Sequence, residues 1–393
     1  MTGPRLAAQS SPDTQPLQLQ PRWAGVLRVV PLYVVAVGVA LFLSALLVQV
    51  TGNSPSATFT ALYSGSLSDG SSIGQTLDEA TPLLLVALGT IICTRAGIFN
   101  IGQEGQLFIG AMFGTAVGLH APDPGWLGLI LTLLASAAGG AMWAAIAAVL
   151  RYWRRVDVVI STLLLSFVAI EVGSFAVNRP WLLQEARVRG SVVAAESDQL
   201  RESVRLPHIG RYPDLNYGTV AFIAVILTVL VVIAINRTRW GFNLRLLGLN
   251  RVVARRSGVR ETWTGGWALV LSGAFAGLAG GVMLTGSAFR FQSGFSNNVG
   301  NEGLLAALVA QGSGIVAMPV AFFFGALRSG GGFLASTGVP RYLVDVVQSL
   351  LVLAAVFPSV YRLRHRLRRG TATPTAAIPP ATPAQPVTGA SVI

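Results

Sequence analysis

The sequence predicts an all-α polytopic membrane protein with about ten transmembrane helices, inverted-repeat halves and broken or re-entrant helices. Hydrophobic residues make up 52% and charged residues 11% of the 393-residue chain, whose mean hydropathy is +0.62. Soluble domains carry roughly 25% charged residues. The apolar residues fall in long blocks, and a bilayer core of about 30 Å needs roughly 20 helical residues to cross it. A polar motif interrupts the apolar pattern twice, at corresponding places in two halves of the chain.

Apolar blocks define a transmembrane domain over residues 26–360. The first block is too long for the core of a signal peptide and lacks a clear cleavage site, so we interpret it as a retained span. Residues 1–22 are rich in Pro, Gln and Ser and are expected to be disordered, as is the tail 361–393 beyond its basic start. The candidate crossings are 26–50, 74–94, 100–119, 126–150, 157–178, 216–236, 263–287, 299–314, 316–336 and 342–360.

Arginine placement orients these spans, because Lys and Arg concentrate in short cytoplasmic loops. Three arginine-rich segments, residues 151–155, 237–262 and 362–369, fall on one side of the ten-span arrangement, which puts both termini in the cytoplasm. Loop 179–215 has six arginines against five acidic residues, a balance that suits an external face where a soluble partner docks. The net charge of +12 therefore indicates membrane topology and contact with membrane lipid, and we expect no nucleic-acid binding.

Residue types that are missing or isolated exclude several kinds of chemistry. All 28 basic residues are arginine, so the chain has no lysine for a Walker A phosphate-binding loop. ATP and Mg²⁺ are therefore expected on partner subunits, and no cofactor is expected on this chain. The single cysteine and the three histidines are scattered, so neither a catalytic group nor a metal site is predicted.

A motif of the form Asn-apolar-Gly-x-Glu-Gly-x-Leu occurs at residues 100–107 and again at 298–305. In the ten-span arrangement the two copies begin crossings of opposite direction, as expected for inverted repeats over about 74–178 and 263–360. Short, glycine-interrupted apolar segments at matching places indicate discontinuous helices that line a transport site. Each half also has a doubled GxxxG pattern that favours close helix packing. Its glycines are Gly110, Gly114, Gly118, Gly273, Gly277 and Gly281.

The two motifs place carboxylates, Glu104 and Glu302, at membrane depth. A charge at the bilayer centre costs about 2.5–3.5 kcal/mol, so each carboxylate should face a wet cavity, pair with a partner or be protonated. Each is equally compatible with capping the amides of a half-helix, and both roles can hold together. Polar neighbours and two phenylalanines complete the predicted substrate path. Its candidate residues are Phe99, Asn100, Gln103, Glu104, Gln106, Phe295, Asn298, Asn301 and Glu302.

Five stretches carry a resemblance to a known family. They are TPLLLVALGTIICTRAGIFNIGQEGQLFIGA (81–111), DVVISTLLLSFVA (157–169), TRWGFNLRLLGLNRVVARRSGV (238–259), LSGAFAGLAGG (271–281) and PVAFFFGALRSGG (319–331). Over about residues 74–360 the chain resembles permease subunits of ATP-binding-cassette importers for nucleosides and simple sugars, within the branched-chain amino acid and ribose permease superfamily. The resemblance implies an integral permease without an ATPase of its own, with related four-helix halves around a central path.

The resemblance also implies that loop 237–262 carries a coupling helix on which the ATPase docks. Two positions depart from the family pattern, because Val253 stands where alanine is usual and Arg251 is bulkier and more charged than usual. The second motif also differs from the Gly-Phe-Asp-Gly-like stretch of the family, which bears on the shape of the pocket. The residues assigned to coupling are Arg245, Gly248, Asn250, Ala254, Arg255, Ser257 and Gly258.

The sequence thus predicts a cell-membrane permease that imports a nucleoside or a related simple-sugar-type small polar solute. Its implied partners are a cytoplasmic ATP-binding-cassette ATPase, a second permease that is a copy or a paralogue, and an extracellular substrate-binding lipoprotein. One alternative is an ion-coupled secondary transporter that uses Glu104 and Glu302 as a titrating relay. A membrane-embedded enzyme is the other alternative, but the sequence has no cluster of nucleophiles, bases or metal ligands.

Overall fold

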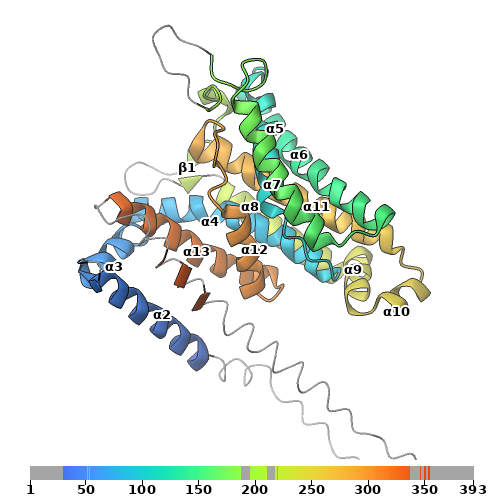
Figure 1. The fold of residues 1–393 in the computed structure, drawn as a ribbon, viewed down its shortest axis with the longest axis horizontal. Coiled ribbons are helices and arrows are strands. Elements are labelled where there is room, and N and C mark those ends of the chain that lie inside the picture. The colour runs from blue at the N-terminus through green and yellow to red at the C-terminus, as the bar shows by residue number, and fades with distance from the viewer. Residues whose placement is uncertain are drawn as a thin grey trace, which may run out of the picture.

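Helices dominate the structure, a computed structural model in which two short strands form a single antiparallel pair (Figure 1). The structure describes residues 30–50, 52, 54–186, 195–209, 217–218 and 220–336, together with 346, 349, 350, 353 and 354. The predicted disordered termini, residues 1–22 and 361–393, lie outside the described residues. Most of the predicted last crossing, 342–360, lies outside them as well.

The element boundaries follow the apolar blocks with several changes. The helices are α2 (Val30–Val50), α3 (Pro55–Ser64), α4 (Gly70–Arg95), α5 (Gln103–Leu119), α6 (Gly125–Arg154), α7 (Val158–Val177), α8 (Val220–Arg237), α9 (Arg239–Leu249), α10 (Arg251–Arg256), α11 (Glu261–Met283), α12 (Val299–Val309) and α13 (Gly314–Ser336). A 3₁₀ turn η1 (Glu202–Val204), a π-helical turn η2 (Leu284–Ala288) and the strands β1 (His208–Ile209) and β2 (Tyr217–Gly218) complete the order.

The predicted class of all-α polytopic membrane protein is confirmed, whereas the number of crossings stays a prediction. Among the described residues, five helices are long and apolar enough to span a bilayer: α4, α6, α7, α11 with η2, and α13. The number rises to seven if the bent pairs α2–α3 and α8–α9 each form one span, and α8 meets α9 at 70°. The predicted crossing 299–314 contains the 11-residue helix α12, which is too short to span a bilayer by itself.

Helix α4 lies in the middle of the bundle, with α12 and α13 on one side (Figure 1). Asp69 begins the helix, because its carboxylate accepts a hydrogen bond of 2.7 Å from the backbone N–H of Ser72. Residues 80–93 are buried on every side, which agrees with a segment that is apolar around its whole circumference. The surrounding helices α8, α11, α12 and α13 are thus built around a single buried span.

Helices α5, α6 and α11 approach one another through glycines. A methyl group built at Gly110 of α5 would lie 2.3 Å from the Cα atom of Gly277 on α11. At Gly140 of α6, a methyl group would lie 2.7 Å from the same atom. These separations are shorter than any carbon–carbon contact, so no side chain fits where the three backbones meet. The structure places Gly114 and Gly281 against Ser136, Gly118 against Leu200 and Thr132, and Gly273 against Gly140 and Ala144.

Substitution of Gly110 by alanine is expected to destabilise the bundle, because the new methyl group meets backbone atoms that cannot rotate away. Overpacking of this kind costs about 1–3 kcal/mol. The matched control is Gly266→Ala on α11, where the nearest atom lies 3.8 Å from the added methyl group. Unfolding of both variants in the same detergent measures the difference. Equal stability of the two variants would contradict this account of the helix crossing.

Candidate transport site

The two copies of the motif lie at two breaks in the helical path. The first break, residues 96–102, separates α4 from α5 and contains Gly97 at a positive φ of 70°. The second, residues 289–298, separates η2 from α12 and ends with Asn298 at a φ of 67°. In each half, the motif glutamate lies in the first turn of the helix that follows the break. The breaks therefore expose helix N-termini whose amide groups need acceptors.

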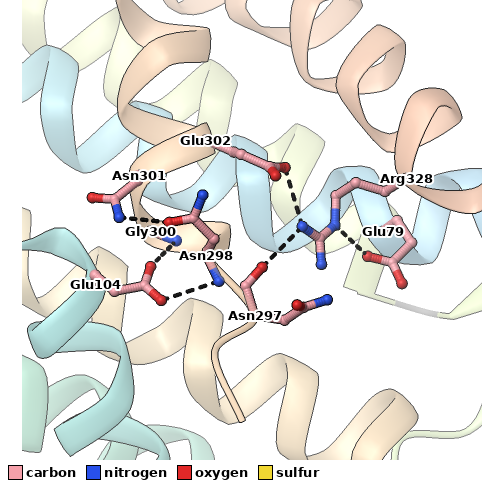
Figure 2. A network of polar contacts seen from close by, with 8 residues as sticks. All are labelled: Glu79, Glu104, Asn297, Asn298, Gly300, Asn301, Glu302 and Arg328. Carbon is pink, nitrogen blue, oxygen red and sulfur yellow. Dashed lines mark hydrogen bonds and ion pairs between the residues drawn. The ribbon is translucent and has the colours of Figure 1, made fainter. Parts of the chain in front are cut away.

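Glu104 of α5 supplies the acceptor for the N-terminus of α12 (Figure 2). Its carboxylate accepts a hydrogen bond of 3.1 Å from the backbone N–H of Asn298 and one of 2.7 Å from that of Gly300. The residue is 8% exposed, so these charge-assisted bonds are made away from bulk water. A methyl group at Gly300 would lie 2.5 Å from the Cα atom of Glu104, so the second motif needs glycine for this approach.

Glu302 occupies the equivalent position but has a different partner. Its carboxylate lies 3.1 Å from Nη1 of Arg328 on α13, and Nε of the same arginine lies 2.9 Å from Glu79 on α4. The arginine also donates a hydrogen bond of 3.2 Å to the carbonyl oxygen of Asn297. Figure 2 shows the guanidinium group between the two carboxylates. Reasoning from the sequence could not decide the partners of Arg328, because Glu79 and Glu302 lie 249 and 26 residues away along the chain.

Asn100, Gln103 and Gln106 form a buried hydrogen-bond network behind the first break. Asn100 donates to the side-chain oxygen of Gln106 at 2.9 Å and to the hydroxyl of Ser272 at 3.1 Å. Gln103 donates to the same serine at 2.8 Å and to Thr90 at 2.9 Å. These three predicted path residues are at most 2% exposed, and they join α4, α5 and α11.

The remaining predicted path residues differ in exposure. Phe295 is 6% exposed and its ring centroid lies 5.6 Å from that of Phe291, so it packs inside the protein. Phe99 is 36% exposed at the first break. Asn298 is exposed, and its side-chain oxygen accepts a hydrogen bond of 2.7 Å from half-buried Asn301. The surface of the site is thus formed by the asparagines, while its carboxylates and glutamines hold the helices together.

The segment assigned to coupling forms α9 and α10, which lie together at one end of the bundle (Figure 1). Asn250 caps α10 by accepting hydrogen bonds of 2.9 and 3.1 Å from the amides of Val252 and Val253. Ala254 is fully buried, Ser257 is exposed, and Gly258 ends the segment at a φ of 81°.

Ion pairs fix α10 to the start of α11, and a close backbone approach brings the end of α9 against the end of α4. Glu261 at the start of α11 pairs with Arg255, and it lies 3.7 Å from Arg251. A methyl group at Gly248 would lie 2.4 Å from the carbonyl oxygen of Arg95, so α9 touches the end of α4 directly. Nε of Arg245 is buried beside this crossing and has no hydrogen-bond partner among the described residues.

The outer face of this segment is apolar, which reasoning from the sequence missed. Leu249 is 85%, Val252 60% and Val253 45% exposed. The three arginines of α10, Arg251, Arg255 and Arg256, are exposed on the same short helix. The sequence does contain apolar residues in a strongly basic loop. Whether they are exposed depends on which side of α10 packs against α9, and the sequence does not show this. An apolar patch with a charged rim is typical of a protein interface.

The arrangement offers binding and conformational change. Within the part of the chain that the structure describes, no three His, Cys, Asp or Glu side chains lie close enough to hold a metal ion. Broken helices whose ends meet inside a helical bundle are typical of membrane transport proteins. The fold and the site thus define the class as a polytopic transport protein.

Comparison with known proteins gives the family. The chain belongs to the family described as branched-chain amino acid transport system / permease component, whose model matches residues 72–356. It is therefore a multi-pass permease subunit of an ATP-binding-cassette transporter for small polar solutes. Such a transporter also includes an ATPase and a substrate-binding protein. The resemblance stated from the sequence is confirmed.

Three curated relatives cover most of this chain. A glucose ABC transporter permease protein from Haloferax volcanii is 30% identical over 91% of this chain and 96% of its own length. A guanosine ABC transporter permease protein from Bacillus subtilis is 30% identical over 82% of this chain and 91% of its own length. A nucleoside ABC transporter permease protein from Lactococcus lactis is 28% identical over 82% of this chain and 89% of its own length. No solved structure matches the chain significantly.

Replacement of Arg328 by methionine is expected to destabilise the protein by about 3 kcal/mol, because it leaves two inward-facing carboxylates without their cation. Glu302 and Arg328 have side chains only 13% and 9% exposed, whereas Glu79 is 41% exposed and recovers part of its hydration. The triple variant Glu79→Gln, Glu302→Gln, Arg328→Met should regain most of the loss. Unfolding in detergent measures the effect, and Arg154→Met on the exposed end of α6 is the control. A loss no larger than that of the control would contradict the role of the triad.

Proposed function

We propose that this permease imports a nucleoside, with free energy from a separate cytoplasmic ATPase that docks on α9 and α10. The observation that carries the proposal is the family match together with guanosine and nucleoside permeases that align over more than four-fifths of this chain. The glucose permease relative keeps simple sugars within the range of solutes to be tested.

The division of labour follows from the residues of the chain. With no lysine, the polypeptide has no Walker A loop, so ATP and Mg²⁺ belong to the partner ATPase. An exterior lipoprotein would deliver the solute, and a second permease, as a copy or a paralogue, would complete the path. Both termini would lie in the cytoplasm, on the same side as α10, in agreement with the arginine distribution.

The meeting of the two breaks supports a path beside α5 and α12. Asn298 and Asn301 present amide groups that suit a polar solute, and Phe99 presents a ring at the other break. Glu104, Glu302, Asn100, Gln103, Gln106 and Phe295 would frame this path from behind. The rocking of one half against the other would open the path to each side in turn.

The ion-coupled alternative finds less support in this geometry. Glu104 is bonded to two amides and Glu302 is paired with Arg328, so protonation of either would break a contact that holds helices together. A proton relay needs groups that can gain and lose a proton while the fold is retained. Glu104 and Glu302, the carboxylates of the two motifs, do not meet this requirement.

Uptake by proteoliposomes tests the proposed function. The permease, its ATPase and its second permease are reconstituted, and the binding protein loaded with radiolabelled guanosine, uridine or glucose is added. We expect nucleoside uptake that needs ATP and persists when an ionophore collapses the ion gradients. Uptake without nucleotide that stops with the ionophore would refute the proposal in favour of ion coupling, and uptake of glucose alone would refute the nucleoside assignment.

Aspartate in place of Leu249 and Val252 is expected to uncouple the transporter, because it puts charge into the apolar face proposed to bind the ATPase. Both side chains are exposed, so the fold should be retained. We expect ATP-dependent uptake to fall at least about tenfold and the ATPase to be lost on affinity purification of the permease, as for a truncated hot spot. Thr262→Asp, exposed beside α10, is the control. Full uptake by the double variant would contradict the docking assignment.

A further inference from the structure

A single carboxylate interrupts the exposed apolar face of α7, a helix long enough to span the bilayer by itself. Glu171 is the only charged residue between Val158 and Val177, and its side chain lies on the exposed side. The last residue of the helix, Val177, lies six positions further along the chain, a rise of about 9 Å. No hydrogen bond or ion pair to this carboxylate is present among the described residues. Glu171 takes no part in the capping of α12 by Glu104 or in the ion pairs of Arg328 with Glu79 and Glu302.

Lipid is a poor environment for this face. An ionised carboxylate in the hydrocarbon region is unfavourable, and such groups normally face a cavity or another protein segment. The exposed face of α8 provides the comparison, because the side chains exposed between Phe222 and Ile233 are all apolar. Helix α8 therefore suits lipid along its length, whereas α7, drawn in green in Figure 1, suits a wet surface around Glu171.

Aromatic side chains flank the carboxylate one helical turn away on each side. Phe167 is 60% and Phe175 48% exposed, and their i, i+4 spacing to Glu171 puts all three on one face. Together with Val168 and Val172 these residues line an open depression of about 560 Å³. Ligand pockets usually enclose roughly 300–1,000 Å³, so one small solute fits this space once a second wall closes it.

Helix α7 also contacts the segment of the second break. Ser174 lies three residues after Glu171, and its hydroxyl is 3.3 Å from that of Ser293. Ser293 belongs to the segment that leads to Asn298, and both residues are exposed. A pair of hydroxyl groups therefore links α7 to the segment that leads to the asparagines proposed to lie in the path.

We propose that Phe167, Glu171 and Phe175 form a contact site for a nucleoside, a step that rests on the proposed function. The rings lie against the base, since aromatic side chains stack on every base. The ionised carboxylate only accepts hydrogen bonds, so it selects donors: the ribose hydroxyl groups or the N–H groups of a base such as guanine. The site is open in a single chain, and the second permease would form its other wall.

Transport by the reconstituted importer tests the carboxylate. Glu171→Gln keeps the shape of the side chain but loses its charge, and we expect KM for guanosine to rise about tenfold or more, the effect of one charge-assisted hydrogen bond. Maximal ATP-dependent uptake should fall less than KM rises. Asp123→Asn, an exposed carboxylate in the turn between α5 and α6, is the control. Unchanged KM in the Glu171 variant, or full uptake by Glu171→Leu, overturns the proposal.

Solute analogues identify the donor. If the ribose hydroxyls bind Glu171, the preference for guanosine over 2′,3′-dideoxyguanosine disappears in Glu171→Gln. If the base binds, the preference for guanosine over inosine, which lacks the 2-amino group, disappears instead. Retention of both preferences in the variant overturns the assignment.

Thiol labelling tests the wet face without measuring activity. Cys93 is fully buried, so a cysteine introduced at Val172 is the main target of a membrane-impermeant maleimide in the assembled importer. We expect labelling at this position that guanosine slows at least about threefold, and much slower labelling of Leu134→Cys, which is exposed on the apolar side of α6. Equal slow labelling of both cysteines overturns the proposal. If wild-type importer takes up no nucleoside, the proposed function fails, whereas labelling without guanosine still reports whether the face is wet.

Discussion

The contact between the Glu104 carboxylate and the first amides of α12 is the constraint on which the architecture depends. Helix α12 has 11 residues and starts at Val299 and Gly300, which are buried, so acceptors for the N–H groups at its start come largely from the protein. A carboxylate from α5 satisfies two of them and places negative charge at the positive end of the helix dipole. The same contact demands glycine at position 300. The two breaks are therefore held against each other, and neither half can close its break alone.

Two copies of one motif serve different purposes here. Glu104 binds the backbone of the other half, while Glu302 faces Arg328 and shares it with Glu79. The related sequences produce similar local structure, namely a helix that begins at the glutamate, but the neighbours of the two helices differ. Because Glu104 and Glu302 both make contacts inside the bundle, the outer surface of the proposed site consists of the asparagines and the exposed face of α7. Residues engaged in packing hold the two breaks together, and the asparagines are the polar groups proposed to contact the solute.

A chain of direct contacts connects the coupling segment to the first break and to the turn that follows α12. The carbonyl oxygen of Arg95 lies against Gly248 at the end of α9, and Gly97 in the first break touches the same glycine. The guanidinium group of Arg95 donates hydrogen bonds of 3.2 and 2.7 Å to the carbonyl oxygen of Gly312, in the turn between α12 and α13. A displacement of α9 therefore acts on the end of α4 and, through one arginine, on the base of α12. The docking proposed at α10 would therefore have a short mechanical route to the proposed path.

The sequence by itself determined the membrane class, the repeated motif, the glycine-rich helices and the absence of a lysine-dependent ATP site. These properties follow from composition and local spacing, which fix hydrophobicity and helix periodicity. Tertiary structure alone decided that Glu104 meets residues 298 and 300, that Arg328 joins Glu79 to Glu302, and that Phe295 and Gln103 are buried. It also decided that Glu171 is exposed. Partners of this kind lie up to about 250 residues apart in the chain, and their choice depends on the angle and rotation at which whole helices pack. Local sequence does not encode that geometry. A polar residue in an apolar run therefore indicates either a functional role or a structural contact, and the sequence alone does not decide between them.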